Sequence, residues 1–167
     1  MKRLQLLFVV ILMLSHTACG VYSFTGASIP AGAKTVSIQY FPNNAMLVEP
    51  TLSIDFTSAL RDKFMSLTNL NLIDKNGDLS FEGEIIEFKT SPIAIQKDQT
   101  ADQNRLTITI NVRFFNKLDP TKDFETKFTQ YKDYSSNQDF NSAKLIVIPE
   151  ILELLVDDVF SKSVVNW

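Results

Sequence analysis

The sequence is poor in the side chains that most enzymes use for proton transfer and metal binding. Its 167 residues include one histidine, His16, and one cysteine, Cys19. Because His16 lies in a stretch that we expect to be cleaved off, the mature chain would have no imidazole for general base catalysis or metal binding. The phosphate-binding G-x-x-x-x-G-K motif and the dinucleotide glycine fingerprint are also missing. These absences argue against an enzyme, and we expect no cofactor.

A long hydrophobic run is also missing. The apolar run Leu4–Leu14 has eleven residues and is interrupted by Gln5, whereas a membrane-spanning helix needs roughly 17 to 25. Lys2 and Arg3 precede the run, and small and polar residues follow it up to Cys19. This order of charge, apolar core and cleavage region is typical of a secretion signal. We therefore predict that residues 1–18 are a lipoprotein signal peptide.

The single cysteine stands where bacterial lipoproteins are acylated. Ala18 and Gly20 fit such a cleavage site, although His16 occupies a position that is usually leucine. Ordinary secretion with cleavage after Ala18 is the alternative, but it would leave a lone thiol in an oxidising compartment without a disulfide partner. We therefore predict lipid attachment, including palmitate, at Cys19. Two or three acyl chains would hold the body durably at a membrane.

The remaining 149 residues are enough for one domain with its own core. The signal contains two of the 16 basic residues and none of the 19 acidic ones, which leaves 14 basic against 19 acidic residues. A negative net charge argues against general nucleic-acid binding. Gly, Ser, Pro and Ala are frequent up to Ala33. We therefore assign residues 19–33 to a lipidated N-terminus and linker, and residues 34–167 to a single domain.

Hydrophobic periodicity predicts an α+β fold. The clearest strand has Leu106, Ile108, Ile110, Val112 and Phe114 on one face and polar residues on the other. The predicted elements in chain order are strand 34–41, helix 50–67, short extended segment 70–73, strand 79–90, strand 105–114, strand 123–134 and a helix whose first turn contains Pro149. We therefore expect two helices on one face of a four-stranded mixed or antiparallel sheet, in the order β-α-β-β-β-α.

Two further features of the strands are local. The apolar phase of strand 79–90 changes beside Gly83, which indicates a bulge or strong twist. Residues 91–103 form a polar loop that is long enough to contact a partner.

Four basic residues are candidates for binding an anionic ligand. Arg105 and Arg113 lie on the polar face of strand 105–114, and the next strand adds Lys127 and Lys132. Arginine forms paired hydrogen bonds to phosphate, so this face could hold phosphate groups. The alternative is that the face is the solvated side of an antiparallel sheet.

Four segments carry a family resemblance. They are Cys19–Phe24, Gly77–Gly83, Asn104–Ile108 and Val164–Trp167. With them, the chain resembles the LptE family of lipopolysaccharide-assembly lipoproteins over essentially the whole mature sequence.

The resemblance implies a non-enzymatic lipoprotein of the cell outer membrane, anchored at the periplasmic face. Such a protein inserts into the lumen of the β-barrel LptD and acts as plug and assembly factor while lipopolysaccharide is delivered to the outer leaflet. The expected partners are an LptD-like β-barrel and lipopolysaccharide. In characterised relatives, basic residues bind the lipid's phosphates, which makes the four basic candidates lipopolysaccharide-binding candidates here. The alternative function is a lipid-anchored periplasmic adaptor that recruits another envelope protein.

Overall fold

The structure is a computed structural model of the chain and describes residues 29–93 and 102–164. The predicted signal peptide, Cys19 and most of the linker lie outside the described residues. Lipid attachment at Cys19 and the boundaries predicted for this region therefore stay predictions.

The described residues form five strands, two α-helices and one short 3₁₀ helix. In chain order these are β1 (Thr35–Ile38), α2 (Leu52–Leu67), β2 (Asn71–Leu72), β3 (Leu79–Ile93), β4 (Gln103–Asn116), η1 (Pro120–Lys122), β5 (Phe124–Ser135) and α3 (Phe140–Val164). The α+β class is confirmed, but the sheet has five strands and not four. The extra strand is β2, which lies in the segment 70–73 that we predicted to be extended. Two residues show no periodicity, so only their pairing with β1 identifies them as part of the sheet.

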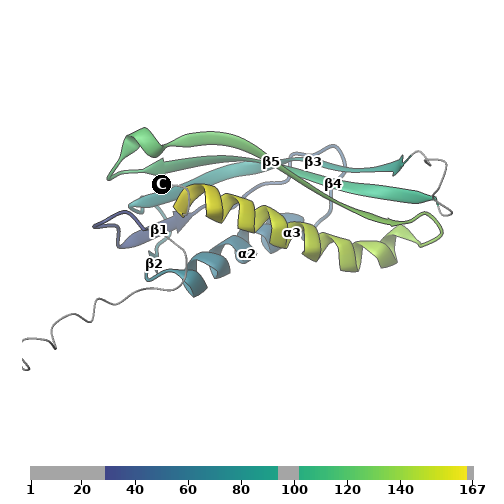
Figure 1. Cartoon of the computed structure of the whole chain (residues 1–167), viewed down its shortest axis with the longest axis horizontal. Coiled ribbons are helices and arrows are strands. Elements are labelled where there is room, and N and C mark those ends of the chain that lie inside the picture. Colours follow the sequence, from purple (N-terminus) through teal and green to yellow (C-terminus); the bar gives the residue numbers. More distant parts are fainter. Residues whose placement is uncertain (1–28, 94–101, 165–167) are drawn as a thin grey trace, which may run out of the picture.

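The sheet has the strand order β2-β1-β3-β4-β5. β1 is parallel to both of its neighbours, whereas β3, β4 and β5 form an antiparallel meander. Both helices lie on the same side of the sheet (Figure 1). No helix or strand of the described residues covers the opposite face of the meander, and we call it the open face.

The core lies between the helices and the sheet. The five apolar residues predicted for one face of strand 105–114 are each at most 1% exposed. Phenylalanine rings connect the layers, because the ring centre of Phe64 in α2 lies 4.9 Å from Phe81 in β3 and 5.0 Å from Phe160 in α3. Removing such apolar surface from water contributes roughly 25 cal/mol per Å².

Asp78 joins the beginnings of β1 and β3. One of its carboxylate oxygens accepts hydrogen bonds from the Lys34 N–H (2.9 Å), the Thr35 N–H (2.9 Å) and the Thr35 hydroxyl (2.8 Å). Because all three bonds favour the charged carboxylate, the Lys34 N–H most strongly, they lower the pKa of Asp78 below its ordinary value.

The bulge in β3 follows the predicted phase change. The register with β4 shifts between Ile85 and Glu87, just beyond Gly83. At Gly83 itself the strands approach so closely that a Cβ atom would lie 2.0 Å from the carbonyl oxygen of Asn111. Only glycine fits a backbone approach of this kind.

The last helix begins at Phe140, so the predicted start at Pro149 is wrong. Asp139 caps the helix, because its carboxylate accepts the Ser142 N–H (3.2 Å) and its carbonyl oxygen accepts the Ala143 N–H (3.0 Å). Pro149 instead lies inside α3, where it cannot donate a hydrogen bond to the carbonyl of Leu145. Proline is common in the first turn of helices, but burial of the stripe that begins at Ala143 favours the longer helix.

Candidate functional site

The open face is made of alternate residues of β3, β4 and β5, which point away from the helices. Arg113 of β4, for example, is flanked across the sheet by Glu82 and Glu125. The acidic residues of this face are Glu82, Glu84, Glu87, Glu125 and Asp133, and the basic residues are Lys89, Arg105, Arg113 and Lys127. Hydroxyl and amide side chains of β4 fill the space between them.

Arg113 is held between two carboxylates. Its Nε donates to Glu82 (3.2 Å), and its terminal nitrogen lies 3.6 Å from Glu84. The hydrogen bond to Glu82, together with the charges nearby, raises the pKa of Arg113 above its ordinary value. The guanidinium is therefore charged and already has acidic partners.

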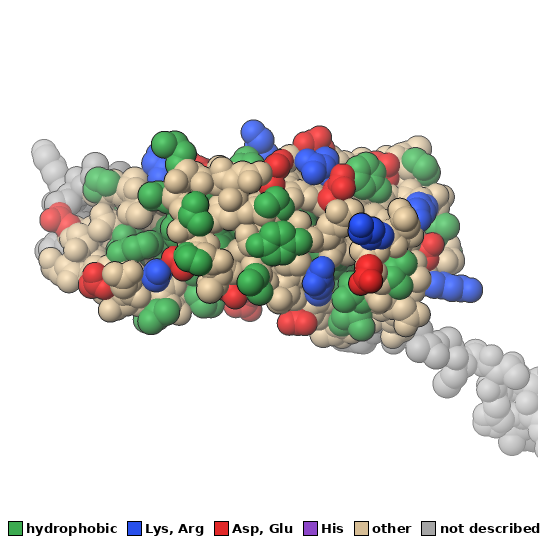
Figure 2. All heavy atoms as spheres, turned by 180° about the vertical axis from the view of Figure 1, so that it is seen from behind, with side chains coloured by type: hydrophobic (Ala, Val, Ile, Leu, Met, Phe, Trp, Pro, Cys, Tyr) green, Lys and Arg blue, Asp and Glu red, His purple; other side chains and the backbone are tan. Residues whose placement is uncertain are grey.

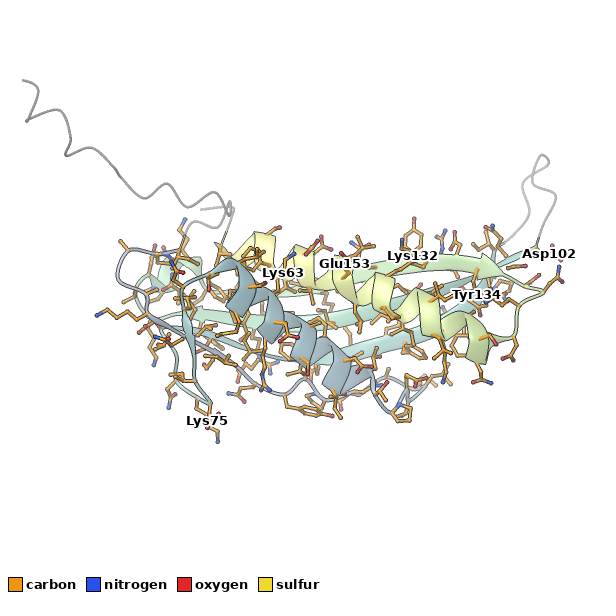
Figure 3. All side chains as sticks on the ribbon, turned by 90° about the horizontal axis from the view of Figure 1, so that it is seen from below. Lys63, Lys75, Asp102, Lys132, Tyr134 and Glu153 are labelled. Carbon is orange, nitrogen blue, oxygen red and sulfur yellow. The ribbon has the colours of Figure 1, made fainter. Side chains whose placement is uncertain are left out.

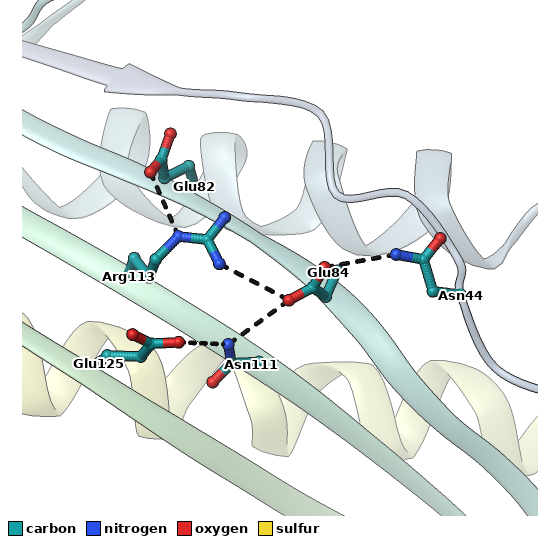
Figure 4. A network of polar contacts seen from close by, with 6 residues as sticks. All are labelled: Asn44, Glu82, Glu84, Asn111, Arg113 and Glu125. Carbon is teal, nitrogen blue, oxygen red and sulfur yellow. Dashed lines mark hydrogen bonds and ion pairs between the residues drawn. The ribbon is translucent and has the colours of Figure 1, made fainter.

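Amide side chains extend this network (Figure 4). The Asn111 amide donates to Glu125 (2.8 Å) and reaches Glu84 at 3.5 Å, while Asn44 donates to the other oxygen of Glu84 (3.3 Å). Figure 4 shows the helices behind the sheet, which places the network on the open face. Asn111 is only 9% exposed because the long side chains around it cover it.

Arg105 makes the second strong pair on the open face. Its Nε and a terminal nitrogen donate to the two carboxylate oxygens of Asp133 at 2.7 and 2.9 Å. The guanidinium also lies over the ring of Tyr131, 3.7 Å from the ring centre. The hydrogen bond to Asp133 raises the pKa of Arg105. Arg105 thus combines a salt bridge with an aromatic contact in a geometry that lysine cannot reproduce.

The LptE lipopolysaccharide-assembly family model matches residues 33–163. The chain belongs to the LptE family. This match confirms the predicted resemblance. The general role of the family is lipopolysaccharide assembly.

Solved structures with a similar fold share little sequence with this LptE-family chain. A putative neuraminyllactose-binding hemagglutinin homolog from Helicobacter pylori has 8% identity and a TM-score of 0.50, covering 81% of this chain and 88% of that one. A minor lipoprotein from Acinetobacter baumannii has 11% identity and a TM-score of 0.49, covering 74% and 91%. The rare lipoprotein B from Shewanella oneidensis has 11% identity and a TM-score of 0.42, covering 74% and 89%. No curated protein sequence matches the chain. At 8% identity the Helicobacter pylori similarity shows the fold alone.

The structure separates the four basic candidates of the LptE-family chain. Arg105, Arg113 and Lys127 lie on the open face, whereas Lys132 points to the helical side and pairs with Glu150 of α3 at 3.1 Å. Side chains alternate along a strand, so residues five positions apart lie on opposite faces. The spacing of Lys127 and Lys132 in the sequence already contained this information.

The open face has no excess of positive charge, because five acidic side chains accompany four basic ones. Seen from behind, acidic and basic side chains are interspersed along the molecule (Figure 2). A phosphate group would have to compete with Asp133 for Arg105 and with Glu82 for Arg113. These carboxylates were not among the predicted site residues, although the alternation of Glu82 and Glu84 with apolar residues in β3 places both on the same face.

Residues 29–93 and 102–164 contain neither a group of side chains suited to a metal ion nor a helix suited to crossing a membrane. Within these ranges, no three His, Cys, Asp or Glu side chains are grouped so that they could hold a metal ion. None of the helices described there is long and apolar enough to cross a membrane.

Proposed function

We propose that the protein is a lipoprotein of the outer membrane that acts as plug and assembly factor for an LptD-like β-barrel. Acyl chains at Cys19 anchor it at the periplasmic face. In this role it supports the transport of lipopolysaccharide and its insertion into the outer leaflet, and it has no enzymatic activity. Membership of the LptE family supports the general role in lipopolysaccharide assembly.

The observation that carries the proposal is the open face of the meander. Its strands have 15, 14 and 12 residues, so β4 is roughly 46 Å long at ~3.3 Å per residue. The length of β4 exceeds the height of the apolar band of outer-membrane barrels, which is about 25 Å. The lumen of such barrels is polar. Because both arginines of this face are already paired with carboxylates, the face can enter a polar lumen without burying either guanidinium as an isolated charge.

Lipopolysaccharide phosphates are the proposed ligands of Arg105, Arg113 and Lys127. A phosphate would replace Asp133 or Glu82 as the acceptor of the guanidinium hydrogen bonds, because phosphate, like carboxylate, can accept two hydrogen bonds from one arginine. Lys132 faces the helices, so a contact between this fourth candidate and the lipid would have to form on the opposite side of the sheet.

Affinity isolation of the membrane-embedded protein after mild solubilisation tests the proposed barrel partner. We expect a large β-barrel to co-purify with the wild type and to be lost when Thr107 and Thr129 of the open face are both changed to Glu. A control is Ser58→Glu, which adds one of these two charges at an exposed position of α2 on the helical side. If the protein is isolated alone when the barrel is abundant, the proposal is wrong.

A lipid-anchored adaptor would respond to a different change. Deleting residues 94–101 should release a partner that is recruited through the loop between β3 and β4. A barrel that is held by the whole open face should be retained. Loss of the isolated partner on this deletion, together with its retention in the Thr107→Glu, Thr129→Glu variant, would favour the adaptor.

A further inference from the structure

A groove of about 640 Å³ lies between α2 and α3, on the side of the molecule opposite the open face. The two helices run in the same direction, and an ion pair spans the groove near each end. Lys144 pairs with Glu49 at 2.9 Å, and Lys63 pairs with Asp157 at 2.6 Å. Figure 3 shows the helices converging near Lys63 and diverging toward their N-terminal ends. The groove is therefore separate from the surface assigned to the barrel.

The two walls of the groove differ in chemistry. The α3 wall carries Leu145, Ile148, Leu152 and Val156, spaced by three or four residues. Leu145 is 74% exposed, whereas Ile148, Leu152 and Val156 are largely buried. The α2 wall carries one small or acidic residue per turn: Thr51, Asp55, Ala59, Asp62 and Ser66. The α2 wall is thus polar and acidic, whereas the α3 wall combines this apolar stripe with the charged residues Lys144, Glu153 and Asp157.

The groove is lined by more acidic than basic side chains, so its net charge is negative. Both lysines of the groove are occupied by the ion pairs at its ends. Within the part of the chain that the structure describes, Asp55, Asp62 and Glu153 have no cationic partner. The groove would repel an anionic ligand, so lipid phosphates are disfavoured. An uncharged acyl chain would contact the apolar wall but leave the carboxylates without a partner.

Pro149 adds a hydrogen-bond acceptor to the apolar wall. Because Pro149 has no N–H, it cannot donate to the carbonyl of Leu145. Both residues line the groove. A ligand that carries cationic N–H donors as well as apolar groups finds carboxylates on α2 and aliphatic side chains on α3.

We propose that this groove docks a basic amphipathic helix of a partner protein. The stretch of α3 between the two ion pairs, from Lys144 to Asp157, covers thirteen positions, or roughly 20 Å at ~1.5 Å per residue. A guest helix of about four turns matches this length. Its apolar stripe packs on α3, and basic residues on the adjoining flank face α2. Asp55 and Asp62 are seven positions apart, so two Lys or Arg residues seven positions apart on a parallel guest helix match both carboxylates.

A designed peptide tests the groove directly. The probe is a fluorescent 14-residue helical peptide with a leucine stripe and two lysines seven positions apart on its flank. The comparison peptide has glutamate at those two positions. Binding is measured by fluorescence anisotropy to the mature chain in nanodiscs of zwitterionic lipid, with empty nanodiscs as background. We expect the lysine peptide to bind at least tenfold more tightly than the glutamate peptide.

Two double variants locate the binding. Asp55→Asn with Asp62→Asn should weaken binding of the lysine peptide at least tenfold. The matched control is Asp74→Asn with Asp102→Asn, which changes net charge equally at two exposed positions outside the groove. Far-UV circular dichroism verifies folding of both. Equal weakening in both variants would mean general electrostatic attraction and would overturn the proposal.

Other occupants of the groove give distinct results. Displacement of the peptide by a fatty acid or by lipopolysaccharide, or a groove-dependent change in oligomeric state, would overturn the proposal in favour of a lipid or a second copy. Binding weaker than millimolar would also overturn it. Barrel co-isolation should be unchanged in Asp55→Asn with Asp62→Asn, so failure of this inference is distinguishable from failure of the proposed function.

Discussion

At Gly83 the backbone of β4 lies close to β3, and replacement of this glycine by alanine should be strongly destabilising. The added Cβ would lie 2.0 Å from the Asn111 carbonyl oxygen, whereas real Cβ atoms essentially never come within 3.0 Å, so the atoms must separate by at least the difference, 1.0 Å. Hydrogen bonds beside this point then exceed their usual length of about 3.2 Å. Losing two of them costs about 1 to 3 kcal/mol. The same Cβ would lie 2.7 Å from the Phe41 ring, and overpacking adds about 1 to 3 kcal/mol.

We therefore expect Gly83→Ala to lower the free energy of unfolding by about 2 to 6 kcal/mol, against totals of roughly 5 to 15 kcal/mol for typical domains. Urea unfolding followed by far-UV circular dichroism measures the change. Lys89→Ala, at an exposed position of the same strand, is the control and should stay within about 0.5 kcal/mol of the wild type. If both variants unfold at the same urea concentration as the wild type, the close approach of the strands is not a constraint on stability.

Three further changes test separate parts of the fold. Phe64→Ala removes a fully buried ring and should lower the free energy of unfolding by about 3 to 5 kcal/mol in the same urea assay. Met65→Ala, at the adjacent and 49% exposed position, should lower it far less. Similar losses in the two variants would contradict the placement of Phe64 in the core. Pro149→Ala restores an N–H donor to the Leu145 carbonyl. It should increase the free energy of unfolding by up to about 3 kcal/mol and therefore raise the thermal midpoint. An unchanged or lower midpoint would argue against a continuous helix. Asp78→Asn should lower stability at pH 7, where the wild-type carboxylate is charged. Because folding lowers the pKa of Asp78, the stability advantage of the wild type should decrease as the pH falls below about 4 and passes through the folded-state pKa. A stability difference that does not depend on pH would be evidence against the role of the charge.

The residue pattern was sufficient for features that depend on local periodicity. The alternation from Arg105 to Phe114 predicted which residues of β4 are buried and which lie on the open face. Apolar periodicity likewise predicted helix 50–67, which corresponds to α2 (Leu52–Leu67). The segments that resemble the LptE family predicted a role in lipopolysaccharide assembly, which the family match confirms. The predictions of burial use only neighbours within one turn or one strand.

The tertiary structure decided the features that depend on distant pairing. β2 has only two residues, and its contact with β1 across 36 positions makes it a strand. The carboxylates that neutralise Arg105 and Arg113 come from neighbouring strands, 28 and 31 positions away. The groove requires α2 and α3 to lie side by side, although about 70 residues separate their ends. Periodicity determines which face of an element is buried, but strand register and helix packing determine which side chains meet.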